Sequence, residues 1–99
     1  MTQSRIAILS NVEDGIRRLP PDIKRGVREA LRAISLDPGR GEALRLDLQD
    51  YMKYRVRRFR IVYSVDRRAR RVTVVAVGHR RTVYEELAAM MRAGSGTDR

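Results

Sequence analysis

Three consecutive segments with the residue pattern of β-strands occupy the second half of the chain, and they restrict the possible folds more than any other feature. In Met52–Arg57, apolar and basic residues alternate, which is typical of a half-buried strand. Arg58–Val65 follows almost at once with the same period, so a tight hairpin is expected between the two. After a polar turn at Asp66–Ala69, Arg71–Val77 is nearly all apolar, as in a central strand. The sequence therefore predicts a meander of three strands.

The first half of the chain predicts one more strand and two helices. Arg5–Leu9 has the composition of a strand, and a short helix is expected near Val12–Arg18. A longer amphipathic helix begins at Pro20–Asp22, because proline suits the first turn and aspartate complements the helix dipole. It ends at Asp37–Gly39. A last helix is predicted over Val83–Arg92.

Together these elements predict an α+β fold in the order β-α-α-β-β-β-α. We expect an antiparallel sheet of about four strands with the helices packed on one face, which leaves the other face to carry arginines. A chain of 99 residues suffices for a single domain with its own core. We place this domain at residues 1–93, followed by a flexible tail at 94–99. Leu44, Leu46 and Leu48 alternate within the intervening loop, so part of that loop is expected to run extended.

Arginine dominates the charge of the chain. The formal net charge is +10, from 22 lysine and arginine residues against 12 aspartate and glutamate residues, and only Lys24 and Lys53 are lysine. Guanidinium groups bind phosphate through two parallel hydrogen bonds and stack on bases, so this bias favours a nucleic acid, RNA above all, as the partner. The alternative is that the charge serves solubility.

Several classes of function are disfavoured by what the sequence lacks. There is no cysteine and one histidine, so we expect no disulfide, no metal site and no other cofactor. We find neither a P-loop nor a glycine-rich dinucleotide turn. No stretch has the apolar character of a signal peptide or the roughly 20 apolar residues of a membrane span. The protein is therefore expected in the cytoplasm.

A set of basic residues is predicted to converge on one sheet face and its edge. Lys53, Arg55 and Arg57 alternate along one predicted strand, and Arg60 lies on the next. The run Gly78–Arg81, which contains a histidine and two arginines, follows the last strand. Fixed cations around a phosphate would stabilise the extra negative charge of a phosphorane transition state. RNA supplies its own nucleophile, the 2′-hydroxyl, so such a site requires no metal.

Three segments carry a family resemblance: Tyr51–Arg57, Phe59–Tyr63 and Val77–Tyr84. With the Leu-Pro-Pro helix start and Leu36–Gly39, this ordered set resembles the RelE/ParE superfamily of toxins from type II toxin–antitoxin modules, in particular its RelE branch. The resemblance spans most of residues 5 to 90. It implies the fold given above, a cytosolic antitoxin partner, which we expect to be acidic, and cleavage of mRNA in the ribosomal A site. The ParE branch shares the fold but acts on DNA gyrase.

The resemblance also implies roles for individual residues. Lys53 and Arg55 match the pair of strand cations of the RelE branch. Arg60 matches its arginine before the Ile-Val-Tyr run, Arg80 its arginine after the last strand, and Tyr84 its C-terminal tyrosine. We therefore expect these five residues to form the catalytic set.

The identity of the general base is left open by the sequence. The RelE branch often has lysine where this chain has Arg55, and arginine stays protonated, so it is a poor base. Lys53, His79 or Tyr84 would have to accept the proton, and histidine fits best because it titrates near neutral pH. His79 is accordingly added to the catalytic candidates.

The remaining arginines of the strands and turns are predicted to bind RNA without taking part in the chemistry. They are Arg57, Arg58, Arg81, Arg67, Arg68 and Arg70. Those between Arg67 and Arg71 surround a turn, where they would form a docking patch for ribosomal RNA.

Each candidate also has a structural interpretation. The strand cations can form an ordinary solvated face, and Arg60 can form an internal ion pair with Asp47, Asp50 or Asp66. His79 can cap a strand end, and Tyr84 can pack against the sheet. Tyr63 is assigned to the core. For the whole protein, the alternatives are a ParE-like inhibitor of gyrase without chemistry of its own and an RNA-binding module without activity.

Overall fold

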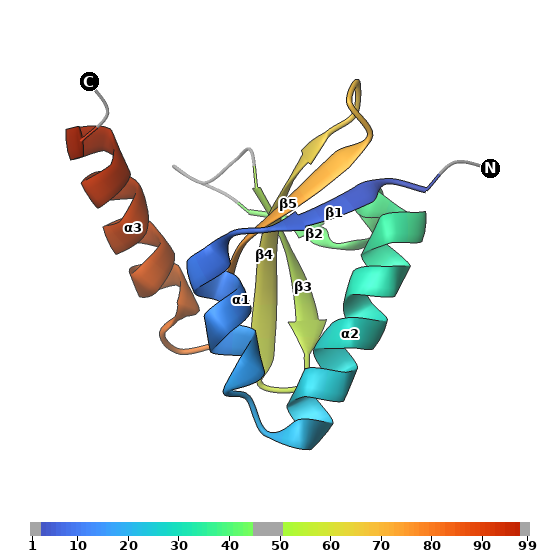
Figure 1. The fold of residues 1–99 in the computed structure, drawn as a ribbon, viewed down its shortest axis with the longest axis horizontal. Coiled ribbons are helices and arrows are strands. Elements are labelled where there is room, and N and C mark those ends of the chain that lie inside the picture. The colour runs from blue at the N-terminus through green and yellow to red at the C-terminus, as the bar shows by residue number, and fades with distance from the viewer. Residues whose placement is uncertain (1–2, 45–50, 98–99) are drawn as a thin grey trace.

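The computed structural model describes residues 3–44 and 51–97 of the chain. Its elements, drawn in Figure 1, are β1 (Arg5–Ile8), α1 (Ser10–Arg17), α2 (Pro21–Leu36), the 3₁₀ turn η1 (Pro38–Arg40), β2 (Glu42–Ala43), β3 (Tyr51–Val56), β4 (Phe59–Asp66), β5 (Arg71–His79) and α3 (Val83–Thr97). The α+β class and the order of the elements are confirmed. Leu46 and Leu48 lie outside the described residues, as do Asp47 and Asp50. The helix α3 continues past residue 93, where the sequence places the end of the domain.

The strands form one sheet in the order β1-β5-β4-β3-β2. β3, β4 and β5 form the predicted antiparallel meander. β1 pairs in parallel with β5, and β2 pairs antiparallel with β3. The sheet thus has five strands rather than about four. The additional strand, β2, has two residues and is too short to leave a periodic signal in the sequence.

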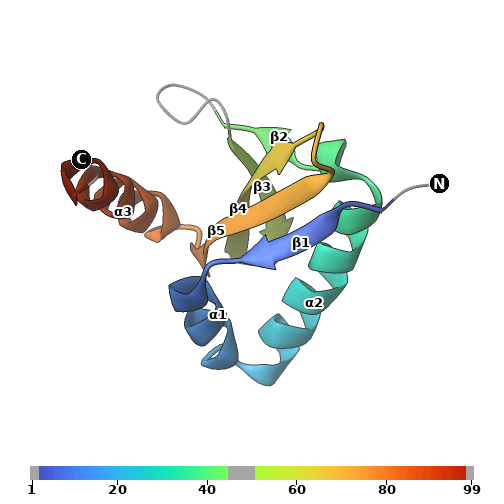
Figure 2. The ribbon, with the colours of Figure 1, turned by 45° about the horizontal axis from the view of Figure 1, so that its top comes forward.

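Two helices cover one face of the sheet. Along α2, the apolar residues recur at helical spacing and are buried: Ile23, Val27, Ala30 and Ile34. They form one core with Val12 of α1 and with Val56, Ile61, Tyr63, Val72 and Val74 of the sheet. Figure 2 shows α1 and α2 side by side below the strands. This is the arrangement that the sequence predicts for the helices.

The third helix lies on the opposite face. Because side chains alternate along a strand, Val62 points away from the face that Ile61 occupies. Val62 and Ala76 form a second buried cluster with Val83 and Leu87 of α3. The helices are therefore not all on one face: α3 covers part of the second, and it projects from the sheet on the side remote from α2 (Figures 1 and 2). No helix in the described part of the chain is long and apolar enough to cross a membrane.

Tyr63 belongs to the core, as predicted, and it also fastens the segment after α2 to the sheet. Its side chain is fully buried. The hydroxyl donates a hydrogen bond to the Pro38 carbonyl (2.9 Å) and accepts one from the Gly41 N–H (3.1 Å). Burial raises the pKa of the Tyr63 phenol above its ordinary value of 10.0, and the Gly41 hydrogen bond partly opposes this. Tyr63 thus positions the chain just before β2.

We expect the Tyr63→Phe variant to lower the free energy of unfolding by about 1–3 kcal/mol, because the Pro38 carbonyl and the Gly41 N–H lose their partner. Its pH dependence provides a second test. The folded state holds the phenolic proton more tightly than the unfolded chain, so stability should fall as the pH rises above about 10. This alkaline loss should be smaller in the variant. Denaturant unfolding from neutral to alkaline pH measures both effects, and an unchanged profile would contradict the assignment.

Candidate functional site

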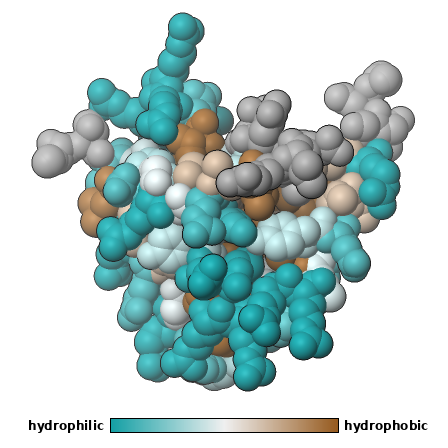
Figure 3. Space-filling model, turned by 180° about the vertical axis from the view of Figure 1, so that it is seen from behind, coloured by the Kyte–Doolittle hydropathy of each residue, from teal (hydrophilic) through white to brown (hydrophobic). Residues whose placement is uncertain are grey.

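Three predicted site cations share the sheet face opposite α1 and α2. Lys53 and Arg55 alternate with the core residues of β3, and Arg60 alternates with those of β4. Arg55 and Arg60 are direct cross-strand partners. Like charges in this position destabilise a sheet, so the pair favours a bound anion. The side of the molecule away from the viewer of Figure 1 is largely hydrophilic (Figure 3).

The guanidinium group of Arg60 is held by the adjacent turn. Its Nη1 donates to the carbonyl oxygens of Arg57 (2.9 Å) and Phe59 (2.8 Å). Within residues 3–44 and 51–97, neither Arg60 nor Arg80 forms an ion pair with a carboxylate, so the predicted partner Asp66 is not used. The two hydrogen bonds to the turn carbonyls therefore fix the Arg60 guanidinium group in position. Its second terminal nitrogen, Nη2, has no protein partner among these residues.

A surface pocket of about 260 Å³ opens beside these cations. It is lined by Arg40, Gly41, Glu42, Lys53, Tyr54, Arg55 and Arg60. Glu42 of β2 is the cross-strand partner of Lys53, and its Oε1 lies 3.7 Å from the Lys53 Nζ. Arg40 and Glu42 could not be predicted as site residues, because the three-residue η1 and the two-residue β2 that carry them leave no periodic signal in the sequence. The pocket therefore combines cations with a carboxylate that can accept a proton.

Gly41 lets the chain pass close to the sheet at this pocket. A Cβ atom at position 41 would lie 2.5 Å from the Lys53 carbonyl oxygen and 2.5 Å from the Tyr63 hydroxyl. Neither atom can yield easily, since one is backbone and the other is buried. The absence of a side chain here is what allows β2 to pair with β3.

We expect Gly41→Ala to displace β2 and, with it, Glu42 from the pocket. The global fold should survive, because β2 lies at the edge of the sheet. Amide hydrogen exchange should therefore accelerate around residues 41–44 and stay unchanged in β4 and β5. Gly39→Ala is the matched control, because a Cβ atom there would meet only Asp37 Oδ1, at an ordinary 3.7 Å. Equal exchange in both variants would contradict this account.

Tyr84 reaches the same region from α3. Gly78 is the cross-strand partner of Arg60. A Cβ atom at Gly78 would lie 3.3 Å from Glu86 Oε1 and 3.5 Å from Val83, so the missing side chain lets the first turn of α3 pack against the sheet there. Partial burial is the largest influence on the pKa of Tyr84 and raises it. The positive charges of Arg60 and Arg55 lower this pKa, and the negative charge of Glu42 raises it. The net effect is upward, so the phenol stays protonated at neutral pH and can donate a hydrogen bond but is a poor base.

His79 is not brought together with these residues. It follows Gly78 on β5 and therefore points to the other face of the sheet. Its ring packs edge-on against Phe59, with the ring centres 5.7 Å apart, and its Nδ1 accepts a hydrogen bond from the Arg81 N–H (3.2 Å). This is the structural role that the sequence offered as the alternative, and it places His79 outside the pocket.

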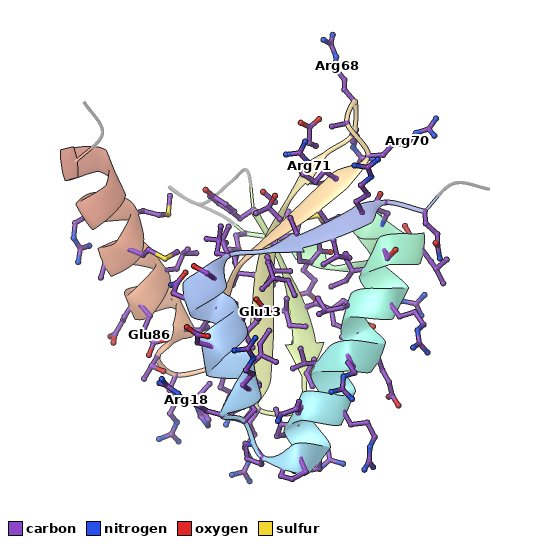
Figure 4. All side chains as sticks on the ribbon, in the orientation of Figure 1. Glu13, Arg18, Arg68, Arg70, Arg71 and Glu86 are labelled. Carbon is purple, nitrogen blue, oxygen red and sulfur yellow. The ribbon has the colours of Figure 1, made fainter. Side chains whose placement is uncertain are left out.

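The other predicted arginines fall at two opposite ends of the sheet. At the pocket end, the Arg80 N–H donates to the Arg58 carbonyl (2.8 Å), which brings the chain after β5 beside the β3–β4 turn. Arg57 in this turn pairs with Asp22 of α2 (3.2 Å). Arg81 follows Arg80 between β5 and α3, at the pocket end. The other three predicted RNA-binding residues, Arg67, Arg68 and Arg70, lie in the β4–β5 turn at the other end of the sheet. Figure 4 shows Arg68 extending from this turn away from the rest of the molecule.

The fold and the site define a basic α+β domain whose second sheet face, covered in part by α3, carries a pocket lined by cations and one carboxylate. Residues 7–84 match the family model described as the ParE toxin of the type II toxin–antitoxin system parDE. The chain therefore belongs to this family of toxins, within the RelE/ParE superfamily. Comparison with curated protein sequences gives no match.

Solved structures show the same fold. The RelBE2 toxin–antitoxin complex of Mycobacterium tuberculosis matches with 26% identity and a TM-score of 0.73 over 80% of this chain and 93% of that one. A mutant of E. coli RelE in the free state matches with 21% identity and a TM-score of 0.73 over 90% and 93% of the two chains. The RelE–RelB complex of Pyrococcus horikoshii matches with 21% identity and a TM-score of 0.67 over 81% and 97%. These three structural relatives contain RelE toxins, whereas the family model carries the name ParE.

Proposed function

We propose that this toxin is an endoribonuclease that cleaves mRNA in the ribosomal A site. The observation that carries the proposal is the pocket that Lys53, Arg55 and Arg60 line together with Glu42. Tyr84 lies near enough for the charges of Arg60, Glu42 and Arg55 to affect its pKa. In the reaction, the RNA 2′-oxygen attacks the adjacent phosphorus and loses its proton to a base. The bond from phosphorus to the 5′-oxygen breaks, and that oxygen takes up a proton. The products are a 2′,3′-cyclic phosphate and a 5′-hydroxyl, and no metal takes part.

The cations would stabilise the phosphorane that forms in this reaction. Arg60 is held by the turn carbonyls, so it is preorganised to bind a non-bridging phosphate oxygen without reorienting. Arg80, at the same end of the sheet, would hold the other side of the phosphate. Lys53 and Arg55 would assist, and the neutral Tyr84 would orient a base or donate a hydrogen bond.

Glu42 is our candidate for the general base. His79 lies on the other sheet face, the Tyr84 phenol keeps its proton, and the Lys53 ammonium is paired with Glu42. The Glu42 carboxylate lines the pocket beside the cations. Among the described residues that line the pocket, Glu42 is the one carboxylate, and a carboxylate can accept a proton from a 2′-hydroxyl.

The partner expected from the RelE–RelB complexes is a cognate antitoxin. The net charge of +10 suits an acidic one. Such a chain could cover the cationic face or displace α3, which carries Tyr84. We expect the protein to act in the cytoplasm, where ribosomes are found.

The second candidate function is inhibition of DNA gyrase, which the ParE family model favours. The two functions differ in their targets. Expression in cells with the antitoxin repressed should stop translation rapidly and cut transcripts within codons if the protein is a ribosome-dependent nuclease. DNA damage with translation and transcripts intact would instead support the gyrase function and refute the first proposal.

A further inference from the structure

The second basic surface lies at the tip formed by the β4–β5 turn and the start of β1. Its arginines are Arg5, Arg67, Arg68, Arg70 and Arg71, and all five are exposed. Arg5 of β1 is the register partner of Arg71, and its N–H donates to the Arg70 carbonyl (2.8 Å), so the two segments form one unit. In Figure 4, Arg68 and Arg70 point away from the body of the molecule. We call these five residues the tip cluster.

The tip cluster has little internal compensation for its charge. None of its five guanidinium groups forms an ion pair with a carboxylate of the described ranges 3–44 and 51–97. Asp66 is the carboxylate within the turn segment, and its Oδ1 accepts a hydrogen bond from the Ala69 N–H (3.0 Å). Arg5 and Arg71 place like charges on neighbouring strands, which is unfavourable without an anion between them. The charge is therefore available to an external polyanion.

The backbone conformation of Arg70 is a second observation on the tip cluster, independent of its charge. Its φ is 53°, in the left-handed region that glycine or asparagine adopts at lower cost. Arg57 in the β3–β4 turn has a similar φ of 55°, so both basic turns hold an arginine in a conformation that costs stability and that turn geometry does not require of arginine. The arginine at position 70 thus suggests that a cation is needed at this point of the turn.

The chemistry of the tip cluster favours a nucleic-acid backbone over a protein partner. Protein interfaces depend on aromatic or large apolar residues at their centre, and the turn residues Arg67–Arg70 contain none, since Ala69 is the one apolar member. Backbone docking on RNA needs only cations arranged along the phosphates. By contrast, the groove between α1 and α2 has apolar lining residues such as Ile8, Ile16 and Val27, which suit a protein segment.

The two basic surfaces are far apart. On β5, Arg71 of the tip cluster and Gly78, the cross-strand partner of Arg60, are seven residues apart, so at about 3.3 Å per residue they are separated by roughly 23 Å. Measured along the axis of a duplex, successive phosphates of one strand are about 3.4 Å apart, so this separation spans about seven of them. One phosphodiester in the pocket cannot also touch the tip cluster.

We propose that the tip cluster is a separate docking site for the phosphate backbone of structured RNA, which holds the toxin while the pocket engages the mRNA. The proposal rests on the proposed nuclease function for the nature of the RNA that is bound. Docking at the tip raises affinity without contacting the scissile phosphate. It therefore affects KM and leaves kcat unchanged.

The test compares the wild-type protein with the triple variant Arg67→Ser, Arg68→Ser, Arg70→Gly. The control Arg25→Gln, Arg28→Gln, Arg32→Gln removes the same charge from exposed positions of α2. Binding to a labelled RNA duplex of about 20 base pairs is measured against salt concentration. The triple variant should bind about 10- to 100-fold more weakly at physiological salt, and the slope of log K against log salt should fall by about two to three, while the control changes affinity less than about threefold.

Cleavage on ribosomes gives the second readout. The triple variant should show a raised KM with kcat within about twofold of the wild type. Equal loss of RNA binding in the triple variant and the control would overturn the proposal. A lower kcat at unchanged KM in the triple variant would also overturn it. The same holds if the triple variant loses antitoxin binding but keeps its RNA binding. If the wild-type protein cuts no mRNA but the triple variant alone loses RNA binding, the docking site stands and the nuclease function fails.

The single variant Arg70→Gly separates a docking role from a structural one. It should raise the melting temperature, because glycine adopts this φ without steric cost, and it should weaken RNA binding at the same time. A higher melting temperature with unchanged RNA affinity would contradict the role assigned to Arg70.

Discussion

The Arg60→Ala variant should cleave ribosome-bound mRNA about 10²- to 10³-fold more slowly than the wild type. The guanidinium group of Arg60 is held by two carbonyl oxygens, those of Arg57 and Phe59. A preorganised donor of this kind stabilises the phosphorane without a reorganisation cost, so its loss falls on kcat. Single-turnover cleavage with saturating toxin measures this rate directly.

The same hydrogen bonds also support the β3–β4 turn, so the variant needs a stability control. Its melting temperature and circular dichroism should show a folded protein at the assay temperature. Arg60→Lys keeps the charge but not the planar fork and should retain more activity than Arg60→Ala. Arg25→Ala, on the exposed side of α2, should cleave like the wild type. Wild-type cleavage by folded Arg60→Ala protein would remove Arg60 from the catalytic set.

The Glu42→Gln variant should lower kcat by about 10²- to 10⁴-fold, the range typical of the loss of a general base. Because the substitution removes a negative charge from the pocket, RNA should bind at least as tightly as before. KM should therefore not rise, and the defect should appear in kcat.

A double-variant cycle with Lys53→Met distinguishes a general base from a residue that only positions Lys53. If Glu42 acted only through its ion pair with Lys53, Glu42→Gln would not lower kcat further in the Lys53→Met background. Glu85→Gln, on the exposed side of α3, is the matched control and should behave as the wild type. A Glu42→Gln variant with the kcat of the wild type would exclude Glu42 as the general base.

The strands of the meander were predictable because each has six or more residues and a clear period. The turn between β3 and β4 has two residues, which fixes the register of the two strands and places Arg55 opposite Arg60. β2 could not be predicted in this way. Two residues carry no period, and their position depends on Gly41 fitting against Tyr63 and Lys53, a contact between distant parts of the chain. Glu42 was missed for the same reason.

His79 and α3 illustrate a different difficulty. His79 was chosen for its ordinary pKa, but the face to which a residue points depends on strand register, and Gly78 rather than His79 faces the pocket. The placement of α3 required knowing that Val62 and Ala76 leave an apolar area on the second face, which Val83 and Leu87 cover. Tyr84 lies near enough to Arg60 for that charge to affect its pKa only because α3 packs on this face, so its proximity to Arg60 could be inferred from the family resemblance but not from the spacing.

The central claim is that the pocket cations bind one RNA phosphodiester and promote attack by the neighbouring 2′-hydroxyl. Its most direct test is end-group analysis of mRNA cut on purified ribosomes in the presence of a chelator. We predict fragments that end in a 2′,3′-cyclic phosphate and begin with a 5′-hydroxyl. Intact mRNA under these conditions, or fragments with a 5′-phosphate, would contradict it.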